Sequence, residues 1–462
     1  MRMINTLGRI ISIAFLCGIF VGPSGAGENA LRSAGQGQSA KERPYLDAAL
    51  KTARWLEQTA VQTSHGLAWP ADPNDPKTTN NSLYAGTPGP VLFFLELYAS
   101  TGNPEFLKVA RAGADELLAA LPAERGTGLY EGLSGIGFTL EEVFKAAKDM
   151  KYRDGFLNGL KRISESAVKA GRGIEWDKVT DIISGSAGTG LFLLYAYQEL
   201  RDKTWLDLAE QAGWRLIDLG RPEKNGLKWA MDPDFPRLMP NFSHGTAGIA
   251  YFLAALYDAA GKKEYIEAAL DGGRYLVSIA KTDGNACLIF HNEPDGKNLF
   301  YLGWCHGPVG TAQLFRRLYG ITGDKNWMGW LEKSAHGIMD SGIPEKETDG
   351  FWNNDGICCG LAGVGDFFLN LYRMTKNLHY LNFCQRVTKK LMAKATIEDG
   401  RMKWIQAEHR VRPELLIAQT GLMQGAAGIG LFLLHLDAFE ERKWPRIVLP
   451  DSVFVHDLMS LK

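Results

Sequence analysis

Three cysteines beside glycine turns are the residues of this chain best suited to carry chemistry. Cys305 lies two residues before Gly307, and Cys358 and Cys359 lie directly before Gly360. Thiolates are preferred ligands of zinc, and three of them leave the fourth tetrahedral position open, as a catalytic site requires. No local zinc motif has its cysteines this far apart in the sequence. They can meet at one ion only if a larger architecture brings the turns together.

A repeat that runs along the chain provides such an architecture. A Gly-x-x-Gly pair followed by an apolar run of helical character occurs seven times. The position 20 residues after the first glycine is aromatic in six of the seven blocks. The pairs are Gly86/Gly89, Gly132/Gly135, Gly185/Gly188, Gly245/Gly248, Gly307/Gly310, Gly360/Gly363 and Gly425/Gly428. The aromatic residues are Phe106, Tyr152, Trp205, Tyr265, Trp327 and Tyr380, with Trp444 one residue early in the last block.

The period of the repeat and its helical pattern of apolar residues predict stacked pairs of helices. A single pair cannot bury its apolar faces alone. The runs after the glycine pairs are apolar nearly all round and are expected to be buried inner helices. The segments 206–219, 266–280 and 328–339 alternate charged and apolar residues, as outer helices do. We therefore predict an all-α fold, an α/α toroid or double-layer barrel of seven helical hairpins. Each inner helix opens with a Gly-x-x-Gly turn, and all the turns lie at one mouth.

This register aligns the cysteines. Neighbouring inner helices pack about 8–10 Å apart, so side chains at equivalent turn positions can converge on one ion. We predict a metal site of Cys305, Cys358 and Cys359, with a set of buried thiols, or a disulfide from Cys305 to one of the other two, as the alternatives. The residues directly before the first glycines are Ala85, Glu131, Ser184, His244, His306, Cys359 and Gln424. One position earlier stand Tyr84, Tyr130, Ile183, Ser243, Cys305, Cys358 and Met423.

Length and composition limit what the toroid does. The chain has 462 residues, 45% of them hydrophobic, which suffices for one large domain with an extensive core. The net charge is −1 with both signs mixed, so nothing indicates a nucleic-acid partner. No apolar run of about 20 residues predicts a membrane span. We expect a monomer.

The N-terminus predicts export. Arg2 and Arg9 precede the apolar stretch 10–21, and Ser24-Gly25-Ala26 fits a signal-peptidase site. We predict a signal peptide over 1–27, a flexible link over 28–43 and a single domain over 44–462, in a periplasmic or secreted protein. A lipoprotein anchor at Cys17 or a buried N-terminal helix fits less well. Off the turn register, Cys287 and Cys384 are expected to be buried thiols, or a disulfide in an oxidising compartment.

The turn residues carry a resemblance to a known family. Trp304-Cys305-His306-Gly307, Cys358-Cys359-Gly360 and the segment 243–248 (Ser-His-Gly-Thr-Ala-Gly) resemble the signature of the lanthionine synthetase C-like (LanC-like) family, in its order and spacing. The resemblance extends through all seven glycine blocks. It implies an α/α toroid with Zn²⁺ at the mouth. It also implies an enzyme that activates the thiol of a peptide or small molecule for addition to a dehydroamino acid, which forms a thioether.

The resemblance also assigns site residues. It places His244 at the family's acid/base position and Asp181 at an acidic position that orients or activates at the mouth. His306, a further catalytic candidate, stands where bacterial cyclases often have Tyr and matches the eukaryotic branch. Two positions depart from the cyclases: Cys359 where many members have His, and Tyr301 where an Arg is common.

Two other classes of function stay open. The absence of that Arg favours a zinc toroid that binds a ligand without catalysing a reaction. Export and the aromatics Trp304 and Trp352 with Asp355 favour a carbohydrate-active toroid enzyme, which needs paired carboxylates. The glycine register offers Glu131 without an obvious partner. His291 and His379 carry no supporting pattern.

Overall fold

A computed structural model describes residues 42–235 and 237–452. The described residues from Arg43 onward form one compact unit. The signal peptide and nearly all of the link predicted from the sequence lie outside the described residues, so those predictions stay untested. Among the described helices, none has the length and apolar character needed to cross a membrane.

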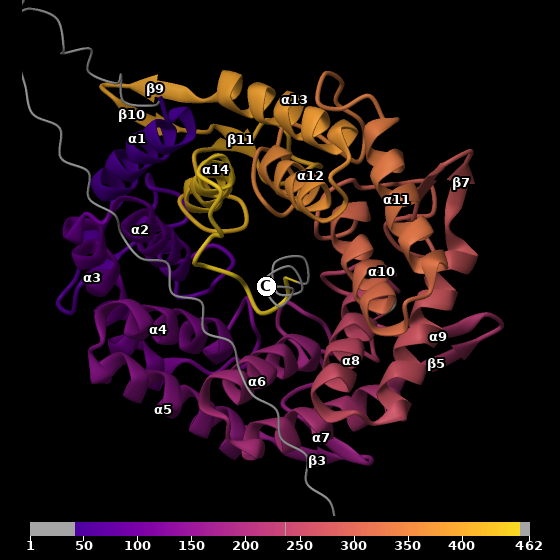
Figure 1. Cartoon of the computed structure of the whole chain (residues 1–462). Helices are drawn as coiled ribbons and strands as arrows, with labels where there is room; N and C mark the ends of the chain where they lie inside the picture. Colours follow the sequence, from indigo (N-terminus) through magenta and orange to yellow (C-terminus); the bar gives the residue numbers. More distant parts are fainter. Residues whose placement is uncertain (1–41, 236, 453–462) are drawn as a thin grey trace, which may run out of the picture. The chain divides into compact units, whose positions relative to one another are not determined.

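The described helices of this unit form two concentric layers, as Figure 1 shows in a view along the axis. Each inner helix contacts the next around the ring, and α14 contacts α2, so the ring is closed. The toroid predicted from the glycine repeat is confirmed. The inner helices are α2 (Pro88–Thr101), α4 (Leu133–Ala147), α6 (Ser186–Leu200), α8 (Thr246–Ala260), α10 (Pro308–Thr322), α12 (Leu361–Thr375) and α14 (Ala426–Glu440). The outer helices are α1 (Pro44–Thr59), α3 (Pro104–Ala120), α5 (Met150–Ser166), α7 (Lys203–Leu219), α9 (Lys263–Ile279), α11 (Lys325–Met339) and α13 (Leu378–Lys394).

One hairpin is assembled differently from the prediction of seven consecutive pairs. The outer partner of α14 is α1, from the opposite end of the chain. Arg43, just before α1, holds α14 through a two-pronged ion pair with buried Asp437, at 2.9 and 2.5 Å. Trp444, taken as the last repeat aromatic, follows α14 outside any helix and packs against Arg373. The ends of the chain therefore close the ring together.

The reversal from inner to outer helix is encoded locally. Arg201 ends α6 in the left-handed conformation, at φ 56°, and Asp202 then caps α7 by accepting a hydrogen bond from the Thr204 amide. A short polar side chain at this position satisfies one of the free amides of the first turn. The same pair of conformations joins α4 to α5, at Lys148 and Asp149.

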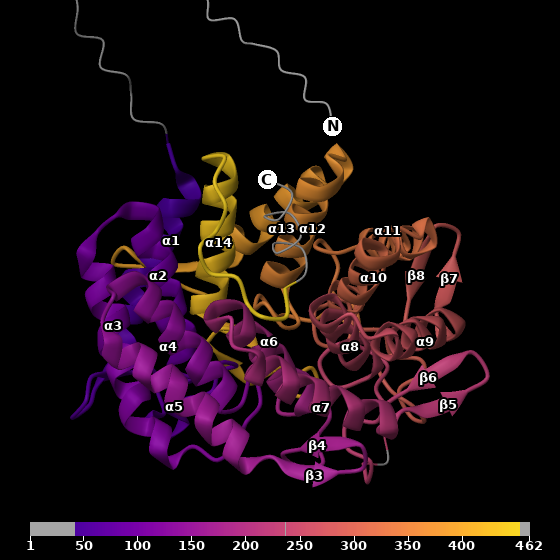
Figure 2. The same ribbon diagram turned by 60° about the horizontal axis from the view of Figure 1, so that its bottom comes forward.

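Short β-hairpins, which the sequence patterns did not predict, follow several outer helices (Figure 2). They are too short to show a two-residue alternation. The described pairs are β1 (Val61–Gln62) with β2 (Leu67–Ala68), β3 (Val168–Ala170) with β4 (Gly173–Glu175), β5 (Arg221–Glu223) with β6 (Gly226–Lys228), β7 (Lys281–Asp283) with β8 (Ala286–Leu288), β9 (Thr396–Glu398) with β10 (Arg401–Lys403), and β11 (Gln406–Ala407) with β12 (Leu416–Ile417). Two 3₁₀ turns, η1 (Pro76–Thr78) and η2 (Leu121–Ala123), complete the described elements.

Four of these hairpins lead into a tryptophan that caps the preceding outer helix. Each indole N–H donates to a carbonyl in the last turn of the helix, where backbone donors become scarce. The bonds measure 2.7 to 2.9 Å and always span 13 residues. The pairs are Trp69 with Leu56, Trp176 with Ile163, Trp229 with Leu216, and Trp404 with Leu391.

A closed ring of backbone hydrogen bonds joins all seven turns at the mouth. Each turn donates an N–H to a carbonyl of the next, always in the same direction, over 2.8 to 3.2 Å. This ring follows the register that contains Cys305 and Cys358. The donors and acceptors are Tyr84 to Tyr130, Tyr130 to Ile183, Ile182 to Ser243, Ser243 to Cys305, Cys305 to Cys358, Cys358 to Met423, and Met423 to Tyr84.

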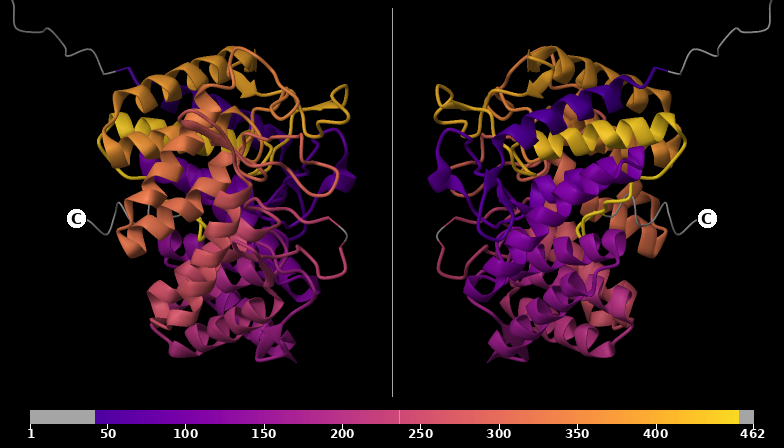
Figure 3. Two further views of the ribbon diagram at one scale, coloured as in Figure 1. Left: turned by 90° about the vertical axis from the view of Figure 1, so that its right-hand side faces the viewer. Right: turned by 90° about the vertical axis from the view of Figure 1, so that its left-hand side faces the viewer.

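The segment after α14 enters the centre of the ring from the end opposite the turns, as the side views in Figure 3 show. The carboxylate of Glu96, on α2, accepts the amides of Arg446 and Ile447. Tyr130 donates its phenol to the buried carboxylate of Asp451 over 3.0 Å. The last described residues thus contact the ring of turns from the side opposite the mouth.

We expect Trp229→Phe to lower the free energy of unfolding by about 2–4 kcal/mol. It removes the indole N–H that the Leu216 carbonyl accepts and opens a small cavity. Trp205→Phe is the control, because the indole nitrogen of Trp205 is buried without a partner. Denaturant midpoints of both variants check this expectation, and equal losses would contradict the capping role.

Candidate functional site

The three cysteines predicted to bind metal meet at the mouth. The Sγ atoms of Cys305 and Cys359 are 3.1 Å apart, and those of Cys359 and Cys358 are 3.4 Å apart. All three side chains are buried free thiols, since a disulfide would need a separation of about 2.05 Å. The predicted convergence of the two turns is therefore present, and the disulfide alternative is not.

The ring of backbone bonds fixes this convergence. Cys358 offers its carbonyl to the amides of Trp304 and Cys305, at 2.7 and 3.2 Å. The turns approach so closely that a Cβ on Gly303 would lie 2.6 Å from the Cys358 carbonyl oxygen and 2.7 Å from the Cα of Cys359. Only glycine fits at this contact.

The donor set suits a thiophilic metal ion. The three sulfurs lie within 4.8 Å of one another, and three sulfurs on one zinc lie about 3.8 Å apart at the usual Zn–S length of about 2.3 Å. Hydrogen bonds from the Cys305 and Cys359 thiols, followed by one from Tyr84, hold the pKa of Cys358 well below its usual value. A negative charge is thus favoured on Cys358, within the cluster. The cluster is compatible with metal binding.

His244 and Asp181, predicted catalytic residues from neighbouring repeats, form a pair beside the cluster. Nδ1 of His244 lies 2.5 Å from Oδ2 of Asp181. The other oxygen of Asp181 accepts the amides of Ser184 and Gly185, which fixes the carboxylate. Burial disfavours a charged imidazole here, but the hydrogen bond and the charge of Asp181 outweigh it and raise the pKa of His244. His244 is thus equipped to carry a proton near neutral pH.

His306 and His291 form a neutral pair beside His244. Their ring centres are 4.1 Å apart, and His306 lies 5.5 Å from His244. Burial, with the two neighbouring histidines, holds the pKa of His306 well below its usual value. Burial also lowers the pKa of His291, against a hydrogen bond with Asn292. No pattern in the sequence singles out His291, because it lies in the loop after β8, outside the glycine register.

Tyr301, where the family resemblance led us to expect an Arg, also lines the cavity. Its ring packs edge-on to His291 and Trp352, with centres 4.5 and 5.2 Å apart. Burial raises the pKa of Tyr301 to about 12, against an opposing hydrogen bond from Arg410. Arg410 lies on the loop between β11 and β12, which the sequence analysis did not single out. Tyr301 is therefore a neutral hydroxyl at neutral pH.

These groups line one cavity of about 540 Å³ at the mouth. This volume is in the range that holds a small molecule or part of a peptide. Glu131 also lines it and accepts a hydrogen bond from Ser184 over 2.9 Å. Asp355 does not line it, because its carboxylate is buried and paired with Lys394 at 2.6 Å. Of the residues named for the carbohydrate alternative, Trp304, Trp352 and Glu131 line this cavity, whereas Asp355 lies outside it.

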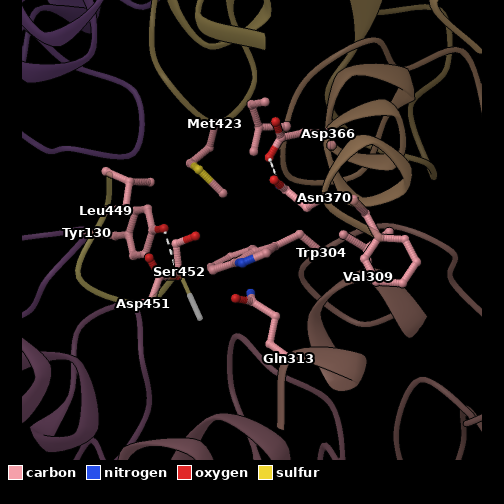
Figure 4. Close-up of a pocket in the computed structure, with 13 residues that line it drawn as sticks. Tyr130, Trp304, Val309, Gln313, Asp366, Asn370, Met423, Leu449, Asp451 and Ser452 are labelled. Atoms are coloured by element: carbon pink, nitrogen blue, oxygen red, sulfur yellow. Dashed lines mark hydrogen bonds between the residues drawn. The ribbon is translucent and has the colours of Figure 1, made fainter. Parts of the chain in front are cut away.

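Trp304 lines both the mouth cavity and a second, smaller cavity of about 100 Å³. Asp451, Gln313 and Asn370 also line the smaller one, which Figure 4 shows. The rings of Tyr130 and Phe242 pack edge-on to Trp304. Outside the site, Cys287 and Cys384 are buried free thiols, without the disulfide considered above.

Comparison with known proteins agrees with these features. The sequence profile described as "Lanthionine synthetase C-like protein" matches residues 77–449, which is most of the chain. The chain belongs to the lanthionine synthetase C-like family. A curated relative, "Glutathione S-transferase LANCL1" of Danio rerio, is 23% identical over 317 residues, which cover 67% of this chain and 73% of the relative.

Solved structures show the same fold. The structure titled "Nisin cyclase" superposes with a TM-score of 0.63 at 16% identity, covering 90% of this chain and 98% of that chain. The Lin0763 protein from Listeria innocua superposes with a TM-score of 0.51 at 14% identity, covering 86% and 97%. The α/α toroid of this family member is thus shared with both.

We expect Gly303→Ala to destabilise the protein by about 1–3 kcal/mol, because its Cβ would force the two cysteine turns apart. The matched control is Gly329→Ala, whose Cβ would meet nothing within 4 Å. Thermal unfolding of both variants tests the difference. A Gly303→Ala protein as stable as wild type would show that the turns do not need this close approach.

Proposed function

We propose that this chain is a zinc enzyme that activates a thiol and adds it to an electrophilic carbon–carbon double bond, such as that of a dehydroamino acid, to form a thioether. The observation that carries the proposal is the cluster of three buried free thiols at the mouth, next to a histidine–aspartate pair and open to a cavity. Membership of the lanthionine synthetase C-like family supports it.

Cys305, Cys358 and Cys359 would hold the zinc ion. When bound there, zinc would supply Lewis acidity that lowers the pKa of a substrate thiol, which is otherwise about 8.5 and mostly protonated at neutral pH. Three thiolates leave one position open for such a ligand. The amino ends of the inner helices all face the mouth, and their partial positive charge offsets part of the negative charge of the cluster.

The protein's other residues handle the proton. As the sulfur bonds to the β-carbon, the electron pair of the double bond moves toward Cα, and an enolate develops on the adjacent carbonyl oxygen. The protonated imidazole of His244 delivers a proton to Cα, and the proton that the thiol lost balances it. Asp181 keeps His244 oriented and protonated. The phenol of Tyr301 and the ring N–H of His306 or His291 are neutral donors suited to the developing enolate oxygen.

The identity of the substrate thiol can be determined by experiment. The name of the zebrafish relative designates it as a glutathione transferase, which makes glutathione the first thiol to try. The predicted signal peptide supports a location outside the cytoplasm, and hence substrates other than a precursor peptide modified before export. We propose a periplasmic or secreted enzyme.

We expect about one zinc ion per purified wild-type chain by elemental analysis. Cys305→Ala and Cys359→Ala should each lose it, because two thiolates bind zinc far more weakly than three. Cys287→Ala, at a buried thiol away from the mouth, is the control and should keep its zinc. Zinc in wild type without any turnover of thiols with dehydroamino-acid acceptors would favour the non-catalytic binding protein instead.

We expect Asp181→Asn to move the alkaline limb of the pH–rate profile to lower pH. The reaction needs protonated His244, whose raised pKa depends on Asp181, so the rate is lost as pH rises through that pKa. Without the carboxylate this pKa falls. Asp283→Asn, on exposed β7, should leave the profile in place. If the alkaline limb of Asp181→Asn is not shifted, His244 is not the group that transfers the proton.

A further inference from the structure

The segment 446–452, here called the lumen strap, runs into the centre of the ring from the end opposite the mouth (Figure 3). Its start is fixed, because the buried carboxylate of Glu96 accepts the amides of Arg446 and Ile447 at 2.9 and 2.7 Å. Near its end lies Asp451, which is only 2% exposed. An ionisable residue at this depth is unfavourable unless its polar atoms have partners. The partners of Asp451 therefore show what the strap holds.

The carboxylate of Asp451 is bonded to a member of the ring of turns. The phenol of Tyr130 donates to its Oδ2 over 3.0 Å (Figure 4). The carbonyl of Tyr130 accepts the amide of Tyr84 over 3.1 Å, and the two rings pack edge-on with centres 6.5 Å apart. The phenol of Tyr84 in turn donates a hydrogen bond to the sulfur of Cys358. One line of contacts thus leads from Asp451 to Cys358.

The backbone of Asp451 is bonded to the turn of Cys305 through Gln313, on α10. The neighbouring donors and acceptors set the orientation of the Gln313 amide. Its nitrogen donates to the Asp451 carbonyl over 2.8 Å, and its oxygen accepts the indole N–H of Trp304 over 3.2 Å. Trp304 directly precedes Cys305, and its own amide donates to the Cys358 carbonyl over 2.7 Å. A second line of contacts thus leads from Asp451 to Cys305.

The indole of Trp304 contacts both lines. The rings of Tyr130 and Phe242 pack edge-on to it, with centres 5.2 and 5.5 Å away. On another side the indole borders the smaller cavity of about 100 Å³, so packing does not enclose it completely. The hydrogen bond to Gln313 is therefore needed to fix its orientation. A change in that orientation moves the turn that presents Cys305 to the other two cysteines.

We propose that Asp451 is a positioning residue for the cysteine site. Through Tyr130 and Gln313 it holds the turns of Cys358 and Cys305 at the separation that a bound metal ion needs. Its importance for thiol chemistry rests on the proposed function, whereas its effect on metal binding needs no turnover. Residues that orient metal ligands typically change metal affinity by about 10- to 100-fold, and Asp451 acts through intermediate residues, so the lower end of this range is expected.

The test uses Co²⁺ as the probe, because its visible absorption reports the number, type and geometry of its ligands. Each metal-free, full-length variant is titrated with Co²⁺, and competition then gives its zinc affinity. Asp451→Ala should bind both ions about tenfold more weakly than wild type and should change the visible spectrum of the Co²⁺ form. Asp451→Asn keeps an oxygen that can accept the Tyr130 phenol, so it should recover most of the affinity and the spectrum.

Single variants separate the two lines of contacts. Tyr130→Phe removes only the phenol and Gln313→Leu removes both amide bonds, and each should weaken Co²⁺ binding by about threefold. Tyr195→Phe is the matched control, because the Tyr195 phenol also donates to a buried carboxylate, that of Glu142, over 2.7 Å. Tyr195 lines neither the mouth cavity nor the smaller one. The control loses the same kind of bond and should bind Co²⁺ as wild type does.

A wild-type spectrum and affinity in Asp451→Ala overturn the inference, and so does a wild type that binds no Co²⁺. Equal losses in Tyr130→Phe and Tyr195→Phe also overturn it, because general destabilisation would then explain both. This last pair decides the question if Asp451→Ala does not fold. Failure of the proposed function looks different: the differences in Co²⁺ binding remain, while no thioether forms from any thiol and acceptor.

Discussion

The ring of backbone hydrogen bonds at the mouth is the constraint on which the rest of the site depends. It takes one amide and one carbonyl from each of the seven turns and runs in a single direction around the axis. Two of its members are Cys305 and Cys358, so the contact that closes the toroid also sets the separation of the sulfurs. Close approach requires a residue without a side chain at Gly303. The same geometry therefore provides both closure of the barrel and the cysteine cluster.

Charged groups of both signs line the mouth around the cysteines. Asp181 and Glu131 lie beside His244, which is favoured in its protonated form. The loop between β11 and β12 brings both Arg410 and Glu408 to the same cavity, with Tyr301 and the neutral His291 near Arg410. A polar substrate that enters the cavity therefore meets charges of both signs.

The sequence predicted the parts of the fold that repeat. The glycine pairs located all seven inner helices, and their register brought Cys305 to Cys358 and Cys359 and His244 to the same mouth. The exchange of α1 into the last hairpin was missed, because it depends on contacts between the two ends of the chain. The β-hairpins were missed because strands of two or three residues leave no pattern.

The unpredicted site residues share one property. His291 and Arg410 lie in loops whose lengths differ between repeats, so the register that located the cysteines says nothing of them. The fixed spacing of 13 residues between a tryptophan and the carbonyl it caps could have anchored the start of the segment that carries Arg410, which follows Trp404. The loop of His291 follows a hairpin without such a tryptophan. Even so, which loop residue points into the cavity depends on contacts such as that of Ala407 with Trp352, and these follow only from the folded chain.

The central claim is a metal centre of three thiolates with one open position. X-ray absorption at the zinc edge of the purified chain, before and after a thiol is added, tests it most directly. The account predicts three sulfur ligands at about 2.3 Å and one lighter ligand, which the added thiol replaces to give four sulfurs. A shell with two or fewer sulfurs, or one that the thiol leaves unchanged, would contradict it.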